Sequence, residues 1–169
     1  MNQTLTLPPL SLYIHIPWCV QKCPYCDFNS HAQKGVIPEQ EYIQHLLMDL
    51  EQDLTSYKTA IGDRKIHSIF IGGGTPSLFS AEGIAYLLAE IRQRIAFNEY
   101  CEITLEANPG TAEAERFIGY AQGGVNRISM GIQSFEPEKL LKLGRIHDNQ
   151  EAIQAVRFAQ HSAKAGLNS

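Results

Sequence analysis

Four apolar segments typical of β-strands alternate with segments typical of helices along nearly the whole 169-residue chain. The strand candidates are residues 10–16, 67–71, 102–107 and 127–132. The helix candidates are residues 37–54, 80–95, 111–121, 137–143 and 149–164. Apolar residues recur every three or four positions in the longer helix candidates, which gives each of these helices one apolar face. This alternation predicts an α/β fold, with a parallel sheet and helices on its outside.

Residues with strong positional preferences mark the ends of these helix candidates. Pro38 suits the first turn of a helix, where its missing N–H leaves no bond unmade. Ser80 can cap the helix that follows it. Gly123 and Gly124 suit the left-handed backbone that ends a helix, and Gly144 ends the short helix before it. Because parallel α/β folds place their chemistry at the carboxyl ends of the strands, we expect functional residues in the loops after each strand.

The loop after the first strand contains three cysteines with C-x3-C-x2-C spacing, Cys19, Cys23 and Cys26. We expect this spacing to bring three thiolates to a single point. A [4Fe–4S] cluster normally takes four cysteine thiolates. Three ligands would therefore leave one iron free to bind something other than protein, which predicts an iron–sulfur site.

Two other interpretations of the cysteines are a zinc site and a disulfide. Zinc prefers four closed ligands, and the fourth would have to be His15, His31 or the distant Cys101. A disulfide framework is typical of small secreted domains, which a chain with four cysteines, three of them closely bunched, does not resemble. Cys101 is expected to be a small buried residue.

The composition is that of an ordinary globular domain, with 44% hydrophobic and 19% charged residues. The formal net charge is -4, and the Lys and Arg residues are scattered, which gives no electrostatic footprint for nucleic acid. No apolar run approaches the ~18–20 residues that cross a bilayer. The first nine residues lack a basic start followed by a hydrophobic stretch. We therefore expect a cytoplasmic protein without a transmembrane segment.

Together with its neighbours, the cysteine motif resembles the radical S-adenosylmethionine (SAM) family. The branch in question holds the oxygen-independent coproporphyrinogen III dehydrogenases and the HemW-type heme chaperones. The matching motifs are LYIHIPWC at residues 12–19, CDFN at 26–29, GGGTPS at 72–77, EANP at 106–109 and GVNRISMGIQSF at 124–135. The resemblance implies a (β/α)6 partial barrel of which about four units are present. Residues 1–169 are accordingly expected to be a radical SAM core domain truncated at its C-terminal end, without the remainder of the barrel and a C-terminal domain.

The resemblance also implies a cofactor contact at the glycine loop after the second strand. In the family this loop runs beside the methionine end of SAM, and the matching residues are Gly73, Gly74 and Thr75. Glycines let a ligand approach the backbone closely. A tight strand-to-helix turn is the alternative explanation of the same residues.

Five further side chains match cofactor contacts of the family. Glu106 is implied to meet the hydroxyls or the ammonium of SAM, Gln133 is a further contact, and Arg145 matches the residue that binds the methionine carboxylate. Tyr25 is implied to lie near the adenine, and Tyr13 is another contact. The alternatives are a solvated carboxylate for Glu106, a surface charge for Arg145 and core positions for both tyrosines.

One departure from the family pattern bears on function. The dehydrogenases carry a fourth cysteine two places after the third, and this chain has Phe28 there. The preferred interpretation is therefore a heme chaperone, whose partners would be heme or porphyrin, a heme-acceptor protein and an electron donor. A coproporphyrinogen III dehydrogenase is the alternative, a zinc-stabilised interaction module a remote one, and no catalytic residue is assigned.

Overall fold

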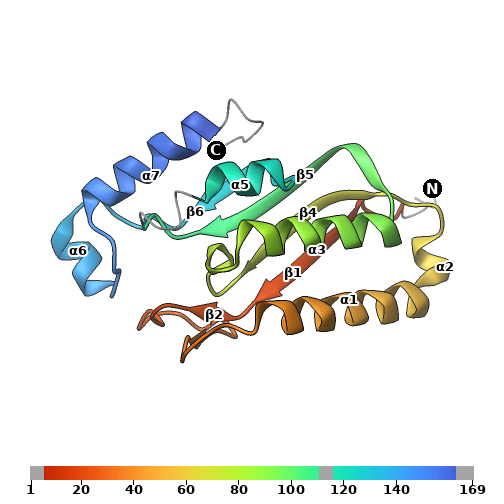
Figure 1. Ribbon diagram of the computed structural model, residues 1–169, viewed down its shortest axis with the longest axis horizontal. Helices are drawn as coiled ribbons and strands as arrows, with labels where there is room; N and C mark the ends of the chain where they lie inside the picture. Colours follow the sequence, from red (N-terminus) through yellow and green to blue (C-terminus); the bar gives the residue numbers. More distant parts are fainter. Residues whose placement is uncertain (1–5, 111–115, 163–169) are drawn as a thin grey trace, which may run out of the picture.

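The computed structural model describes residues 6–110 and 116–162, and its centre is a four-stranded sheet (Figure 1). The strands are β1 (Leu10–Ile16), β4 (Ile66–Gly73), β5 (Phe97–Ala107) and β6 (Arg127–Met130). Their order is β1-β4-β5-β6 and every neighbouring pair is parallel. The predicted α/β architecture of four successive βα units is confirmed.

Helices and two minor strands connect the strands of the sheet. The helices are α1 (Glu39–Ser56), α2 (Lys58–Ile61), α3 (Ala81–Arg94), α5 (Phe117–Gln122), α6 (Pro137–Lys142) and α7 (Asn149–Ser162), with a 3-10 turn η1 (Pro76–Leu78). The minor strands β2 (Trp18–Cys19) and β3 (His31–Ala32) pair in parallel inside the cysteine loop. No helix in the described part of the chain is long and apolar enough to span a membrane.

The core lies between the sheet and a row of helices in which α1 contacts α3, α3 contacts α5 and α5 contacts α7. One face of the sheet supplies buried aliphatic residues, among them Ile14, Ile71 and Leu105, and the helices supply residues such as Leu47 and Leu87. Burying a side chain of this size contributes about 1.5–3 kcal/mol. The helix-covered face therefore supplies most of the stability.

The other face of the sheet carries different side chains in register. Tyr13 on β1 lies beside Phe70 on β4, and their rings stack with centroids 6.3 Å apart. Thr104 on β5 follows, and Arg127 on β6 donates a hydrogen bond to its hydroxyl at 3.2 Å. Tyr13, Phe70 and Arg127 are exposed. This is the face that would point inward in a barrel of the predicted kind.

Several predicted boundaries differ from the structure. The third strand begins at Phe97, five residues earlier than predicted, and the fourth ends at Met130. The fourth strand ends there because Ile132 N–H turns back to Met130 O at 3.0 Å and Gln133 has a φ of 66°. The predicted helix 111–121 is seen from Phe117, and residues 111–115 lie outside the described residues, as do 163 and 164 of the last helix.

The predicted helix ends are confirmed with two corrections. Pro38, predicted to lie in the first turn, is the N-cap residue just before α1. Ser80 Oγ accepts a hydrogen bond from Gly83 N–H at 2.9 Å, as a helix cap should. Gly124 and Gly144 have positive φ values of 107° and 66°. Gly123, predicted to be left-handed, instead continues the right-handed turn with a φ of -74°.

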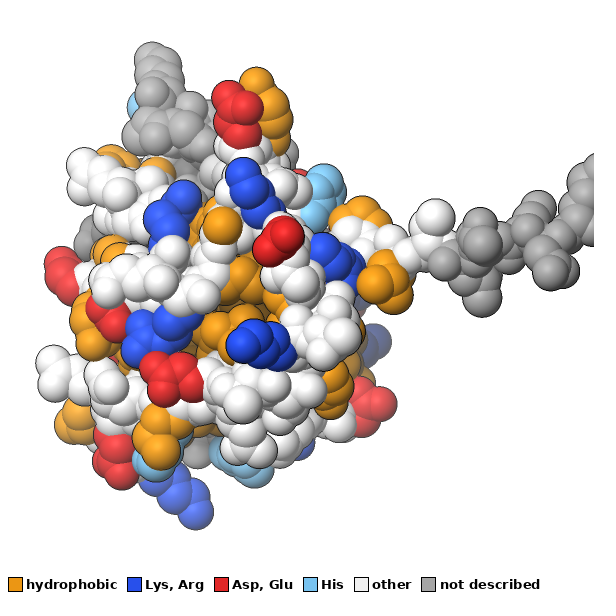
Figure 2. All heavy atoms as spheres, turned by 90° about the vertical axis from the view of Figure 1, so that its right-hand side faces the viewer, with side chains coloured by type: hydrophobic (Ala, Val, Ile, Leu, Met, Phe, Trp, Pro, Cys, Tyr) orange, Lys and Arg blue, Asp and Glu red, His pale blue; other side chains and the backbone are white. Residues whose placement is uncertain are grey.

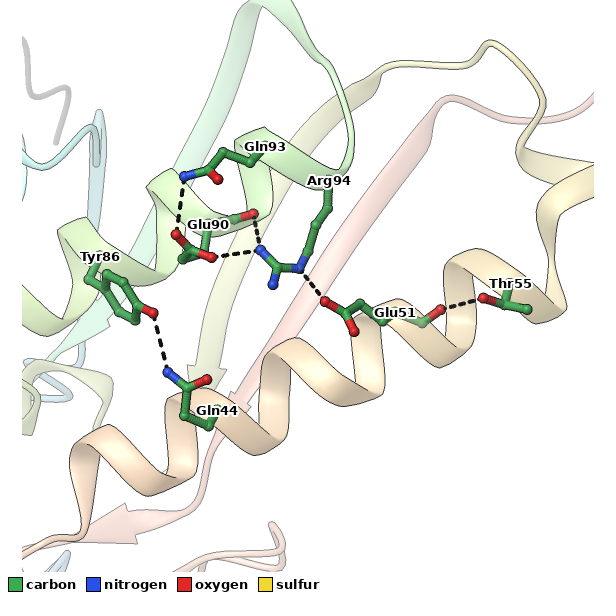
Figure 3. Close-up of polar contacts among 7 residues, drawn as sticks. All are labelled: Gln44, Glu51, Thr55, Tyr86, Glu90, Gln93 and Arg94. Carbon is green, nitrogen blue, oxygen red and sulfur yellow. Dashed lines mark hydrogen bonds and ion pairs between the residues drawn. The ribbon is translucent and has the colours of Figure 1, made fainter.

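Polar contacts join the outer surfaces of α1 and α3 (Figure 3). Arg94 lies 2.8 Å from both Glu51 and Glu90, and Gln44 donates to the Tyr86 hydroxyl at 3.2 Å. Ion pairs at the surface stabilise a fold only weakly, because solvent screens them. These contacts fix the helix register more than they stabilise the fold.

The end of the molecule that carries α2 and the amino ends of the strands has a mixed surface (Figure 2). Lys and Arg side chains alternate there with Asp and Glu around a hollow that shows apolar side chains. The opposite end, where the strands finish, carries the cysteine loop and α6 (Figure 1).

Candidate functional site

A cavity of about 330 Å³ lies at the carboxyl ends of the strands. Its walls come from the cysteine loop, from the ends of β4, β5 and β6, and from the segment after α6. The predicted site residues that line it are Cys19, Cys23, Tyr25, Cys26, Gly73, Gly74, Thr75, Glu106, Gln133 and Arg145. The fold thus brings together residues that are up to 126 positions apart, from Cys19 to Arg145. Tyr13 is not among the lining residues.

The three cysteines are held by the backbone of their loop. Cys19 belongs to β2, and its carbonyl accepts from Gln33 N–H at 2.7 Å. Cys26 N–H donates to Cys23 O at 3.1 Å, which closes a tight turn. All three thiols are free and partly exposed, whereas Cys101 is buried, as predicted.

The three thiols line one cavity, and the expectation that their thiolates meet at one point stays a prediction. Within residues 6–110 and 116–162, no three His, Cys, Asp or Glu side chains gather to hold a single metal ion. A tetrahedral zinc site needs four donors around one ion. A [4Fe–4S] cube presents its irons at separate corners, so thiols spaced around one cavity fit its ligand set.

The glycine loop fits closely against the start of the cysteine loop. Gly74 N–H donates to Ile16 O and Thr75 N–H to Trp18 O, both at 2.7 Å. A Cβ on Gly74 would lie 2.5 Å from Trp18 O, and one on Gly73 would lie 2.7 Å from the His15 ring. Packing of the chain on itself therefore requires both glycines, and they line the cavity as well. These glycines therefore form a tight turn and also line the cavity.

Glu106 extends from the end of β5 to the glycine loop. Its Oε2 accepts a hydrogen bond from Gly73 N–H at 3.2 Å. Burial raises the pKa of the Glu106 carboxyl, and the Gly73 N–H only partly offsets this effect. Glu106 is therefore a half-buried carboxylate with room for a further donor from the cavity.

Arg145 is held from three directions. Its Nη2 donates to Asn108 Oδ1 at 2.7 Å and to Gly131 O at 2.5 Å. Its Nη1 donates to Cys23 Sγ at 3.5 Å. Its Nε is buried and has no hydrogen-bond partner. Arg145 thus points into the cavity and contacts a predicted cluster ligand.

The two tyrosines predicted to contact the cofactor differ in position. Tyr25 lies in the cavity, where burial and the Cys23 thiol raise its pKa while Arg145 opposes the change. The Tyr13 hydroxyl is 2.9 Å from His15 Nδ1, and His15 Nε2 is 2.7 Å from Asn29 O. Since a carbonyl only accepts, Nε2 donates to Asn29 O. This chain of bonds fixes the end of the cysteine loop.

Sequence reasoning gave no role to two side chains beside the cavity. Asn108, inside the EANP motif, lines the cavity and donates through Nδ2 to Thr75 Oγ1 at 3.2 Å. His147 is buried, and its Nε2 donates to Ile132 O at 3.1 Å. Burial, and then the charge of Arg145, lower the pKa of His147. The polar residue at a strand end was a usable signal for Asn108, whereas nothing in the sequence marked His147 as more than a packed residue.

The loop after α6 also touches the cysteine loop directly. Gly144 has a φ of 66°, and a Cβ built on it would lie 2.9 Å from Cδ of Pro24. This contact and the Arg145–Cys23 bond join the segment after α6 to the cysteine loop.

Comparison with known proteins agrees with this geometry. The model of the radical SAM superfamily matches residues 13–165. The chain belongs to this superfamily. The cofactors that the family implies are a [4Fe–4S] cluster and SAM, and the residues of the cavity fit that donor set. The predicted family and fold are therefore confirmed.

Individual relatives narrow the comparison. The chain is 68% identical over 162 residues to the heme chaperone HemW of Haemophilus influenzae, covering 96% of this chain and 42% of that protein. It is 59% identical to HemW of Escherichia coli, covering 90% of this chain and 39% of that protein. The chain thus spans about two-fifths of the length of these relatives.

Solved structures show the same fold. The radical SAM enzyme coproporphyrinogen III oxidase (HemN) of Escherichia coli matches with a TM-score of 0.72 and 30% identity, over 90% of this chain and 34% of that one. Methylornithine synthase (PylB) matches with a TM-score of 0.54 at 14% identity, which shows the fold alone.

Proposed function

We propose that this chain is the cluster-binding and SAM-binding part of a heme chaperone. The observation that best supports the proposal is the 68% and 59% identity to two proteins named heme chaperone HemW, over nearly all of this chain. Heme would be the cargo, bound mainly by residues outside this chain and passed to an acceptor protein. An electron donor would be a further partner.

In this proposal Cys19, Cys23 and Cys26 hold the cluster. The three thiols line one cavity with a cationic side chain beside them, which suits thiolate ligands. When bound and reduced, the cluster supplies the electron for reductive cleavage of SAM, a chemistry that belongs to the cofactors. The protein holds and orients them.

The SAM contacts would come from the remaining walls of the cavity. Arg145 would bind the carboxylate of the methionine part, for which a guanidinium is well suited. Glu106 would accept from the ammonium or the hydroxyls, and a bound cation would lower its raised pKa. The further contacts would be Tyr25, Gly73, Gly74, Thr75, Gln133 and, from the layer of the sheet below, Tyr13.

Phe28 distinguishes the chaperone from the second candidate, a coproporphyrinogen III oxidase. The match to HemN, at 30% identity over 90% of the chain, supports this second candidate only weakly. Phe28, which replaces the fourth cysteine of the dehydrogenase pattern, lines the same cavity as the three cysteines and is 59% exposed. An apolar ring at this position offers no sulfur for the oxidase chemistry.

The test measures both activities in the full-length protein. After anaerobic reconstitution of the cluster, heme should bind in a 1:1 ratio and transfer to an apo heme protein. Coproporphyrinogen III, supplied with SAM and reductant, should remain unconverted. Catalytic formation of protoporphyrinogen would assign the protein to the oxidases instead. A colourless zinc-containing protein would support the interaction module.

A further inference from the structure

Arg145 connects three parts of the molecule that meet at the cavity. Asn108 directly follows β5, Gly131 directly follows β6, and Cys23 lies in the cysteine loop. The family comparison assigns none of these three contacts. Together they place a permanent positive charge within hydrogen-bond distance of one predicted cluster ligand.

Contacts within the protein fix the position of this guanidinium. Both acceptors of Nη2, Asn108 Oδ1 and Gly131 O, lie within 2.7 Å of it. Asn108 is itself oriented by its bond to Thr75 Oγ1. A planar fork can satisfy acceptors on different sides at once, which a lysine ammonium on a flexible stem cannot do in the same geometry.

Two of the known determinants of a cluster's reduction potential are the net charge around it and the hydrogen bonds to its sulfurs. Arg145 supplies both at Cys23. Reduction adds one negative charge to the cluster, so a fixed cation at a ligand sulfur stabilises the reduced state more than the oxidised state.

We propose that Arg145 raises the reduction potential of the cluster through its hydrogen bond to Cys23, and that Asn108 is the positioning residue that holds it there. The inference rests on the proposed cluster site but not on the heme-chaperone role. It adds a second task to Arg145 beside carboxylate binding. Of the five N–H donors of the guanidinium, the bonds to Asn108, Gly131 and Cys23 leave the buried Nε–H and one hydrogen of Nη1 for a ligand.

Binding of SAM should change the charge that Arg145 places beside the cluster. Because one guanidinium would contact both the Cys23 sulfur and the SAM carboxylate, an arriving carboxylate would partly neutralise the cation beside the cluster. The effect of SAM on the cluster potential should therefore depend on Arg145.

The test is a redox titration, followed by EPR, of the reconstituted full-length protein without SAM. Arg145→Gln should lower the reduction equilibrium constant about tenfold, which for a one-electron couple is a shift of about 59 mV to more negative potential. Arg145→Lys should fall between Arg145→Gln and the wild type, because it keeps the charge and loses the fork. Asn108→Ala should shift the potential in the same direction by a smaller amount.

Arg127→Gln is the matched control for lost charge. Arg127 contacts Thr104 and Glu102, and neither of these lines the cavity. Its removal should leave the potential unchanged. An equal shift in Arg127→Gln and Arg145→Gln would overturn the specific role of the Cys23 contact.

A purely structural role of Arg145 would lower the cluster content while the remaining clusters keep the wild-type potential, and this result would overturn the proposal. If Arg145→Gln assembles no cluster, wild-type potentials in both Arg145→Lys and Asn108→Ala would overturn it equally. A wild-type protein that assembles no cluster would refute the proposed site itself. A protein with the predicted shifts that binds no heme would refute only the chaperone role.

Discussion

The helix-covered face of the sheet and the cavity at its carboxyl end are built from opposite kinds of residue. On the covered face the buried side chains are aliphatic, as with Ile71 and Leu105, which are fully buried. Within the described residues, the buried side-chain N and O atoms without a hydrogen-bond partner are Arg145 Nε and His147 Nδ1. Gln133 is the one described non-glycine residue with a positive φ. All three residues lie toward the cavity end. Unsatisfied groups and unusual backbone are typical of functional sites rather than of cores. Substitutions in the two regions should therefore affect different measurements.

The largest expected effect is the loss of the cluster from Cys23→Ser. Removing one of three ligands leaves two irons without protein anchors, so anaerobic reconstitution should give little bound iron. Because Cys23 lies in a partly exposed loop, circular dichroism should remain that of the wild type. Cys101→Ala, a substitution of the buried cysteine in β5, should keep the iron. Full iron content in Cys23→Ser would show that the ligand assignment is wrong.

The next effect should fall on stability alone. Leu105→Ala removes a fully buried side chain from the centre of the sheet and should lower the free energy of unfolding by about 2–5 kcal/mol. Denaturant titration of the full-length protein measures this loss. Iron per folded molecule should not change. A loss of iron at unchanged stability would contradict the expectation that core substitutions affect stability and not the cluster.

Arg145→Ala should act mainly on ligand binding. A charge-assisted hydrogen bond contributes about 1.5–3 kcal/mol, so affinity for SAM should fall roughly 10- to 150-fold. Equilibrium binding to the reconstituted protein measures the change, with Arg127→Ala as the control. Unchanged affinity in Arg145→Ala would show that Arg145 does not bind SAM.

The smallest effect should come from Glu106→Gln, and its sign depends on pH. Because burial raises the pKa of Glu106 above its usual 4.5, the folded state holds its proton more tightly than the unfolded state does. The resulting stability is fully present below pH 4.5 and is lost as the pH rises through the folded pKa. At pH 7 the neutral variant should therefore be more stable by roughly 0.5 kcal/mol, with a gain that disappears in acid.

SAM binding should move in the opposite direction. Glu106→Gln removes the negative charge proposed to meet the ammonium or hydroxyls, so affinity should fall while the melting temperature at pH 7 rises. A variant that is less stable at pH 7 would show that the Glu106 carboxylate is better solvated than its half-buried position indicates.

The sequence predicted the features that local chemistry determines. The apolar strands, the Ser80 cap and the glycine end of α6 depend on residues close together in the chain, and all were confirmed. The resemblance to the family predicted which residues would share one cavity, and the fold places all of them there except Tyr13. The meeting of the three thiolates at one point, which the cysteine spacing suggested, stays a prediction.

Features that depend on distant parts of the chain were not predictable. The early start of β5 at Phe97 reflects pairing with Ile66 on β4. The close packing of Gly74 on Trp18 and the bond between Arg145 and Asn108 join segments far apart in sequence. Neither composition nor periodicity contains information about such contacts.

The close approach of Gly144 to Pro24 limits how this protein can vary. Position 144 has both a left-handed backbone and a proline ring in the space of its missing side chain, so it cannot acquire a Cβ while the proline stays. A smaller residue at position 24 would remove one of these two restrictions. In an alignment of the family, a residue other than glycine at position 144 should therefore occur only where position 24 is not proline, although 119 residues separate the two positions in the chain.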